Sequence, residues 1–319
     1  MTRVALSPLP APLFATVALI GIGLIGASIA HACARTGAAG RLVIHDSDAA
    51  ALARAEALGL GQVYAPSLTE AVRDADLVIL CAPVGANAEI AQRMAPALKA
   101  GAIVSDVGSV KSAVVAEVGP RLPQGVHFVP AHPVAGTEYS GPDAGFATLF
   151  RNRWCILTPP PGTGRQAVDK VQAFWAAFGA NVEIMTPEHH DLVLAITSHV
   201  PHVVAYTLVG AAADLEDSLR SEVIKFSAGG FRDSTRLAAS DPTMWRDVFL
   251  NNREAVMEML GRFTEELTAL QRMIRRGDGD GLFDLFTRTR AIRRAIVEQG
   301  QETAAPDFGR RAQEDAGEA

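Results

Sequence analysis

The sequence predicts an α/β domain built on a doubly wound parallel sheet, followed by an all-α domain. In the first half, short apolar runs alternate with Ala-rich helical segments, a pattern typical of parallel strands joined by helices. In the second half, apolar residues recur at helical spacing. We expect the α/β domain over 14–186 and the helical domain over 187–300. An N-terminal extension covers 1–13, and a polar, disordered tail covers 301–319.

The expected strands are short apolar runs of three or four residues. They lie at 17–20, 42–45, 77–80, 103–106, 127–130, 155–157 and 182–185. The first run ends in a glycine-rich turn that opens a helix reaching about Arg35. Helices alternate with the following runs, so we assign all of them to one sheet.

Two helix starts are visible in the second half. Thr186-Pro187 and Asp241-Pro242 each combine a capping side chain with a proline in the first turn. The first helix should run to about Ala213 with a kink at Pro201, because proline removes one backbone hydrogen bond. The second should run unbroken to the glycines at 277–281. A last amphipathic helix then covers 282–297.

Composition limits the function classes. The 319 residues are 49% hydrophobic and 20% charged, with a net charge of −6. An acidic balance indicates neither a nucleic-acid surface nor an anionic-membrane surface. Three separated cysteines, Cys33, Cys81 and Cys155, cannot form a disulfide framework or a Cys-rich zinc site. A reducing cytoplasm therefore suits this chain.

One stretch is long enough to cross a bilayer. Residues 192–213 carry no charged side chain and are flanked by Asp191 and Asp214. His199, Pro201 and His202 lie in its middle, where lipid would penalise the imidazoles. We therefore expect a helix buried in the core or in a subunit interface, and no membrane partner.

A glycine-rich motif, Gly21-Ile22-Gly23-Leu24-Ile25-Gly26, follows the first strand. Its first glycine allows a tight turn, its second lets the backbone approach a pyrophosphate, and its third permits close helix packing. Amides at the start of the next helix, near Leu24 and Ile25, would donate hydrogen bonds to the phosphates. The alternative is a purely structural glycine turn.

Asp46 extends this motif. It ends the second strand, 20 residues after Gly26. A carboxylate at this place accepts hydrogen bonds from the adenosine ribose and repels a 2′-phosphate. Ser47 and Asp48 follow it, so no adjacent arginine would hold that phosphate. The sequence therefore favours NAD over NADP as the cofactor.

The unusual polar segments fall near the expected cofactor. Carboxyl ends of parallel strands form the ligand edge of such a sheet. Two segments, 106–111 and 131–138, lie there, and Ser198-His-Val-Pro-His202 lies on the kinked helix. The segments 229–236 and 240–247 follow. His199 and His202, three residues apart, share one helical face.

These motifs resemble the prephenate/arogenate (cyclohexadienyl) dehydrogenase family of tyrosine biosynthesis. The resemblance covers about residues 14–298. It is carried by Gly-Ser-Val-Lys at 108–111, His-Pro-Val-Ala-Gly at 132–136 and Ser-His-Val-Pro-His at 198–202. It implies NAD-dependent oxidative decarboxylation of prephenate or arogenate, and a homodimer joined through the helical domain.

The resemblance also implies residue roles. His132 matches the family's catalytic histidine and Ser109 its partner; His202 matches a substrate-site histidine and Arg236 a carboxylate-binding arginine. The residue chemistry agrees, because a neutral imidazole suits proton removal near neutral pH and a guanidinium binds a carboxylate through two hydrogen bonds. We also expect Thr137 and His199 to face the substrate, and Ser109 to contact the cofactor.

Glu138 has two possible roles. Its carboxylate could pair with the ammonium group of arogenate, or it could form an ion pair with Arg236 that gates the site. If it recognises the amine, Glu138→Gln should lower turnover of arogenate more than turnover of prephenate. Equal losses on both substrates would remove the amine-recognition role.

Two other interpretations of the function stay open. A β-hydroxyacid dehydrogenase would need a catalytic lysine with asparagine four residues later, but Lys225, the lysine of the helical half, has Gly229 there. A non-catalytic NAD-binding protein would not need His132, Ser109 and Arg236. We expect no metal, and interpret His189-His190-Asp191 as a solvated first helical turn rather than a metal site.

Overall fold

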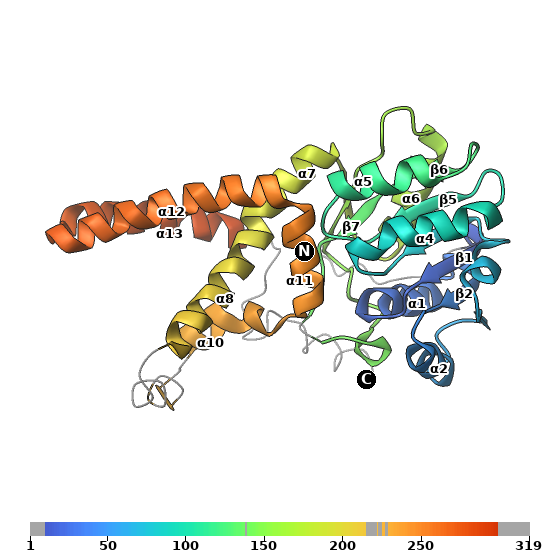
Figure 1. Ribbon diagram of the computed structural model, residues 1–319, viewed down its shortest axis with the longest axis horizontal. Coiled ribbons are helices and arrows are strands. Elements are labelled where there is room, and N and C mark those ends of the chain that lie inside the picture. The colour runs from blue at the N-terminus through green and yellow to red at the C-terminus, as the bar shows by residue number, and fades with distance from the viewer. Residues whose placement is uncertain (1–9, 138, 215–221, 223–224, 227–228, 299–319) are drawn as a thin grey trace. The chain divides into compact units, whose positions relative to one another are not determined.

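The computed structural model describes residues 10–137, 139–214, 222, 225–226 and 229–298 (Figure 1). Contacts divide the chain into two compact units, Met1–Met259 and Leu260–Ala319, which are described separately. The expected extension over 1–13 is described only from residue 10, and the expected tail over 301–319 lies outside the described residues. The domain limits expected from the sequence stay predictions.

A six-stranded parallel sheet forms the centre of the first unit, in the order β3-β2-β1-β4-β5-β6. Its strands are β1 (Phe14–Ile20), β2 (Ala39–His45), β3 (Val63–Tyr64), β4 (Leu77–Leu80), β5 (Ile103–Asp106) and β6 (His127–Phe128). The strand order reverses between β1 and β4, which places a ligand crevice at their carboxyl ends. The predicted doubly wound α/β fold is confirmed.

The last two predicted strands belong to a different sheet, so their assignment to the main sheet was wrong. β8 (Trp154–Leu157) and β9 (Asn181–Ile184) form a three-stranded sheet with β7 (Ala131–Pro133), which runs antiparallel to β8. β7 follows β6 after two residues. A parallel neighbour needs a crossover of a dozen residues or more, so the chain leaves the main sheet here.

Helices cover the strands and make up most of the chain beyond residue 186. Those of the first half are α1 (Leu24–Thr36), α2 (Ala49–Ala57), α3 (Leu68–Val72), α4 (Asn87–Met94), α5 (Ser112–Val118) and α6 (Arg165–Ala177). Those that follow are α7 (Pro187–Leu194), α8 (Val200–Ala213), α10 (Gly229–Thr235), α11 (Pro242–Asn251), α12 (Arg253–Arg276) and α13 (Gly279–Glu298). Thr186 and Asp241 cap α7 and α11 as predicted, through bonds to the amides of His189 and Met244.

Two predicted helices are interrupted. Between α7 and α8 the chain makes a π-helical turn, η5 (Ala195–His199), directly before Pro201. The predicted helix from Pro242 to the glycines at 277–281 breaks at Asn252, which has φ −115° and ψ 35°. The Asn252 side chain bonds to the Asp191 carbonyl instead of lying free on a helix surface. Its tertiary contact therefore outweighs the helical periodicity around it.

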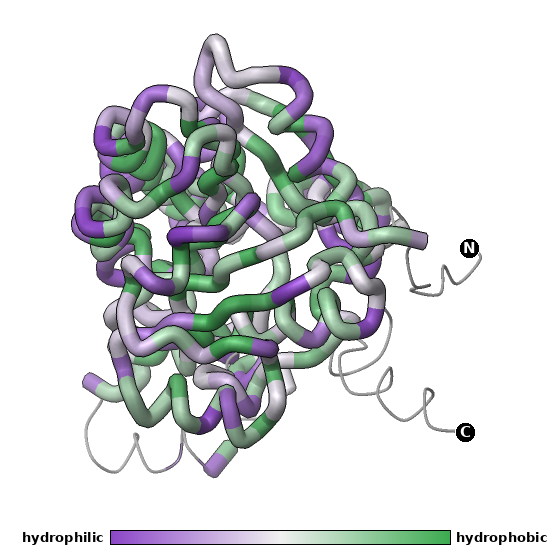
Figure 2. Tube along the Cα trace, turned by 90° about the vertical axis from the view of Figure 1, so that its right-hand side faces the viewer, coloured by the Kyte–Doolittle hydropathy of each residue, from purple (hydrophilic) through white to green (hydrophobic). Residues whose placement is uncertain are grey.

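The core of the first unit lies on both faces of the main sheet. All four residues of β4 are buried, and Figure 2 shows hydrophobic strand segments running through the middle of this part of the chain. On one face Phe150 packs edge-on against Trp175 with ring centroids 5.1 Å apart, and Phe174 and Phe178 complete the group. Phe174 also meets Phe14, the first residue of β1, with ring centroids 5.8 Å apart, so α6 packs on the main sheet.

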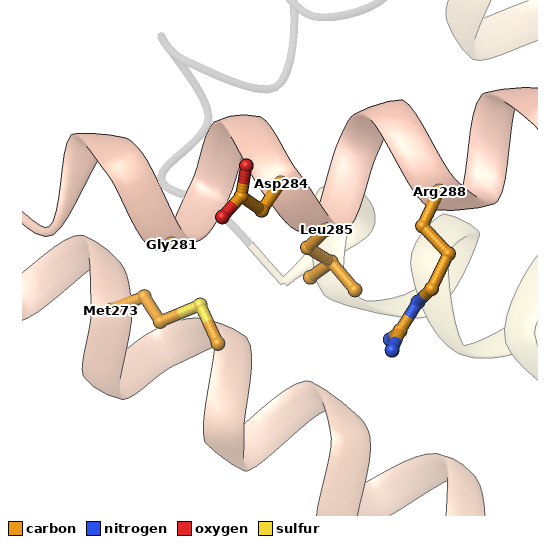
Figure 3. Close-up of a pocket in the computed structure, with 5 residues that line it drawn as sticks. All are labelled: Met273, Gly281, Asp284, Leu285 and Arg288. Atoms are coloured by element: carbon orange, nitrogen blue, oxygen red, sulfur yellow. The ribbon is translucent and has the colours of Figure 1, made fainter.

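The α7–η5–α8 helix, Pro187–Ala213, is long and apolar enough to cross a membrane by length and composition, and 28% of its most apolar window is buried. In the second unit, α13 exposes Phe283, Phe286 and Ile292. A hollow of about 280 Å³ lies there, into which Met273 and Leu285 extend (Figure 3). None of the predicted site residues lines it.

Candidate active site

Glycine is needed at the three positions of the motif for different structural reasons. Gly21 has φ +103°, and a Cβ there would lie 2.8 Å from the Cys81 carbonyl group. A Cβ on Gly26 would lie 2.3 Å from the Gly21 carbonyl oxygen, inside the turn itself. A Cβ on Gly23 would meet nothing within 4 Å. Gly23 therefore faces open space, whereas Gly21 and Gly26 shape the turn.

This turn forms a cradle that fits a dinucleotide. α1 begins at Leu24, and no side chain caps its first amides, so they are available to phosphate oxygens. Asp46 lies beside them because its Oδ2 accepts a hydrogen bond from the Ile22 amide at 2.8 Å. Its Oδ1 accepts one from the Asp48 amide at 2.9 Å. Open space, free amides and an oriented carboxylate are the features that NAD needs.

A buried ion pair shapes the loop after β5. Neither Lys111 nor Asp106 exposes any side-chain surface, and Lys111 Nζ lies 2.5 Å from Asp106 Oδ2. The same carboxylate oxygen accepts the Gly108 amide at 2.8 Å. Ser109 lies between these anchored residues and is half-buried. The loop that carries it is therefore held at both ends.

His132 lies at the end of a hydrogen-bonded chain of buried side chains. Its Nδ1 is 2.8 Å from Nε2 of His190, and His190 Nδ1 is 2.8 Å from Oδ1 of Asp191. Burial raises the pKa of Asp191, but hydrogen bonds from His190, Ser112 and Lys111 together hold it below its usual value, so this carboxylate is ionised. His190 must then donate from Nδ1 and accept at Nε2. His132 in turn donates from Nδ1, which leaves a lone pair on its Nε2.

His132 is also kept neutral. Burial lowers its pKa well below the usual value, and the nearby His190, Lys111 and His199 lower it further. An uncharged imidazole with a fixed tautomer is a competent proton acceptor at neutral pH.

The two histidines predicted to share a helical face meet the same indole ring. His202 stacks on Trp245 with ring centroids 3.4 Å apart, and His199 meets it edge-on at 6.0 Å. Asn252 Nδ2 lies 3.1 Å from His199 Nδ1, and His202 Nδ1 bonds the Ser198 carbonyl at 2.8 Å. Burial is the main cause that lowers the pKa of each histidine to about 4.

Other predicted site residues lie on neighbouring segments. Arg236 begins the short helix η6 (Arg236–Ala239), is half-buried, and lowers the pKa of His202 through its charge. The Ser109 carbonyl raises the pKa of His199. Thr137 is half-buried and accepts a hydrogen bond from the Tyr139 amide. Glu138 lies outside the described residues.

The interpretation of residues 189–191 as a solvated turn was wrong for two of them. His189 is exposed, but His190 is fully buried and Asp191 is 4% exposed. Their burial follows from the helix period, since Pro187, His190 and Leu194 share the buried face of α7. That spacing is visible in the sequence and points to His190. No group of three or more His, Cys, Asp or Glu gathers as a metal site in the described ranges.

The buried histidines predict an acid-sensitive fold. An unfolded histidine titrates near about pH 6.5, whereas His199 and His202 titrate at about 4 in the folded chain. Between these values the unfolded state binds more protons, so stability is full above about pH 6.5 and falls as the pH drops toward 4. His202→Asn, whose amide can still bond the Ser198 carbonyl, should lose less melting temperature between pH 7.5 and 5 than the wild type. His189→Asn, at an exposed position, should lose as much melting temperature as the wild type. Equal losses of melting temperature in all three proteins would show that the buried histidines are not the cause of the acid sensitivity.

Comparisons with known proteins agree with this geometry. The model of the prephenate dehydrogenase nucleotide-binding domain matches residues 29–184, and that of the prephenate dehydrogenase dimerization domain matches 186–288. The cyclohexadienyl dehydrogenase of Zymomonas mobilis is 43% identical over 283 residues, covering 89% of this chain and 96% of that protein.

Solved structures are similar over most of the chain. The prephenate dehydrogenase of Aquifex aeolicus, in complex with hydroxyphenyl propionate and NAD+, is 34% identical with a TM-score of 0.83, covering 88% of this chain and 98% of that one. The Synechocystis arogenate dehydrogenase is 26% identical with a TM-score of 0.75, covering 88% and 99%. From its two matching domains and its 43% identical relative, this chain belongs to the prephenate dehydrogenase family.

Proposed function

We propose that this protein is an NAD-dependent dehydrogenase that oxidises and decarboxylates prephenate, arogenate or both. A hydride leaves ring carbon C4 as the C4 hydroxyl gives its proton to the base. The C1–carboxylate bond then breaks to release carbon dioxide, and its electron pair passes through the ring to the C4 oxygen, which takes a proton back. The ring becomes aromatic, giving 4-hydroxyphenylpyruvate from prephenate or tyrosine from arogenate. NAD, when bound, accepts the hydride.

One observation carries the assignment of the base: the buried chain from His132 through His190 to Asp191. It fixes the His132 tautomer with a lone pair on Nε2, the atom that would take the hydroxyl proton. The imidazolium that forms is stabilised through His190 by the ionised Asp191. Ser109, on the anchored loop, would orient the same hydroxyl.

The remaining roles follow from charge and position. Arg236 would bind a substrate carboxylate through its guanidinium. His202, held flat against Trp245, would form a wall of the substrate site, with His199 and Thr137 nearby. Gly21, Gly23 and Gly26, the amides near Leu24 and Ile25, and Asp46 would hold the dinucleotide.

We also propose a cytoplasmic homodimer. The matched model over 186–288 describes a dimerization domain. Large apolar side chains stay exposed on α8 and α13, including Leu208, Val209, Phe283 and Phe286. Exposed apolar surface of this kind is typical of an interface between subunits.

The function is tested by following NADH formation with prephenate and arogenate separately, each with NAD and with NADP. We expect turnover with NAD on at least one substrate, and much weaker turnover with NADP because Asp46 repels its 2′-phosphate. The ratio of the turnover rates with prephenate and arogenate then gives the substrate preference. Folded protein that reduces neither cofactor with either substrate would contradict the proposal.

His190→Asn distinguishes a catalytic role of the His132–His190–Asp191 hydrogen bonds from a purely structural one. Its amide can still donate to Asp191, but it offers no ring nitrogen to accept the His132 proton. We expect kcat to fall by about 100-fold while the KM for NAD stays near the wild-type value. His189→Asn, the same change at the exposed neighbour, should leave both constants unchanged. Equal activity of the two variants would show that His190 has no part in the reaction.

A further inference from the structure

Lys111 lies where three segments of the site meet, and the reaction described above does not use it. Its ammonium donates to Asp106 Oδ2 at 2.5 Å and to the Ala131 carbonyl at 2.7 Å. Its main-chain amide donates to Asp191 Oδ1 at 2.8 Å. Neither side chain of the Lys111–Asp106 pair is exposed.

Each of these contacts is made with a different segment of the site. Asp106 begins the loop that carries Ser109, Ala131 immediately precedes His132, and Asp191 orients His190. Lys111 therefore joins the end of β5, the start of β7 and helix α7, which carry or orient the proposed reacting groups Ser109 and His132.

Stability alone does not account for this pair. Removing two charges from water costs about as much as their attraction returns, and apolar replacements of buried pairs are often neutral. The ammonium does provide fixed direction: one donor bonds the carboxylate and another bonds the carbonyl before His132. A flexible apolar side chain of equal length would fill the space without holding either segment.

We propose that Lys111 is a positioning residue for the dehydrogenation, which holds His132 and the Ser109 loop in their reactive arrangement. The proposal rests on the proposed function, with His132 as its base. Positioning errors of about 1 Å cost about 100-fold in rate, so the loss of one anchor should appear in kcat.

The charge of Lys111 gives the proposal a second readout. The titratable groups around His132 are Lys111 and Asp106 from the β5 loop, His190 and Asp191 on α7, His199 on η5 and Cys155 on β8. Burial is the largest cause of the low pKa of His132, and the Lys111 charge lowers it further. Without that charge the pKa of His132 rises, so the acid limb of kcat/KM moves to higher pH.

The experiment compares Lys111→Met, the double variant Lys111→Met with Asp106→Asn, and Lys99→Met. The double variant removes both charges and leaves no buried carboxylate without its partner. It therefore tests the proposal even if the single variant fails to fold. Lys99 is a matched control, since its Nζ also bonds an aspartate (Asp76, 2.6 Å) and a carbonyl (Asp74, 3.0 Å). That pair lies beyond the opposite end of β4, which begins at Leu77.

We expect the double variant to melt within a few degrees of the wild type. Its kcat should fall by about 100-fold and its KM for NAD should stay within about two-fold. The acid limb should move to higher pH in Lys111→Met, which loses the positive charge alone, whereas the double variant loses two opposite charges. Lys99→Met should keep the wild-type kcat and pH profile. A folded double variant that behaves like Lys99→Met would overturn the role of Lys111. A wild-type protein silent on both substrates would overturn the proposed function, and this role with it.

Discussion

His132→Asn is expected to lower kcat by about 1,000-fold while leaving the affinity for NAD unchanged. General-base catalysis contributes about 100- to 10,000-fold, and this residue is the one placed to supply it. Asparagine can still donate a hydrogen bond to His190 Nε2 from its amide, so the buried chain to Asp191 keeps its geometry. It has no lone pair that accepts a proton at neutral pH.

Steady-state NADH formation measures the loss, and calorimetric titration with NAD measures the affinity. A parallel series in pH strengthens the result, since the small residual rate of the variant should lack the acid limb that the wild type shows. If the variant kept more than about a tenth of the wild-type kcat, another group would have to remove the proton.

Substitutions in the glycine turn should separate folding from cofactor binding. In Gly26→Ala the new Cβ would lie 2.3 Å from the Gly21 carbonyl oxygen, so the turn must open, and both the melting temperature and NAD affinity should fall. In Gly23→Ala the Cβ meets no protein atom within 4 Å, so the fold should keep its melting temperature. Its NAD affinity should still fall at least about ten-fold, because the methyl group occupies the approach of the pyrophosphate.

Thermal unfolding and NAD titration of the two variants give both readouts. Gly37→Ala is a useful comparison for the turn, because that glycine has φ +69° but no atom within 4 Å of its Cβ and ends α1 away from the motif. It should lose stability through backbone strain without a specific loss of NAD affinity. A Gly23→Ala protein that binds NAD as tightly as the wild type would show that the cofactor does not approach this turn.

Much of the fold follows from local pattern, and its errors have a common cause. The main strands and the capped helix starts are set by short-range apolar runs and by Thr186 and Asp241, so sequence reasoning finds them. Which sheet residues 154–157 join depends on how the chain turns after β6. The sequence of the strand itself does not predict that turn. The break at Asn252 likewise depends on its bond to the Asp191 carbonyl, 61 residues away.

The site was less accessible to sequence reasoning than the fold. His132, Ser109 and His202 came from motifs and Arg236 from the family resemblance, whereas the supporting roles of other residues were not predicted. Asp106 and Lys111 lie in the segment 106–111 that the sequence singles out, but their complete burial and their ion pair are visible only in the structure. Trp245 lies in the segment 240–247, but its stacking on His202 is visible only in the structure. Supporting residues are specified by tertiary contacts, so single-residue patterns miss them.

The most direct test of the account measures NADH and carbon dioxide together during turnover by the wild-type protein. The proposed reaction couples hydride loss from C4 to loss of the C1 carboxylate. We therefore expect one NADH, one carbon dioxide and one aromatic product for each substrate consumed. Carbon dioxide release without NADH, or an NADH signal with no aromatic product, would contradict oxidative decarboxylation as the reaction of this site.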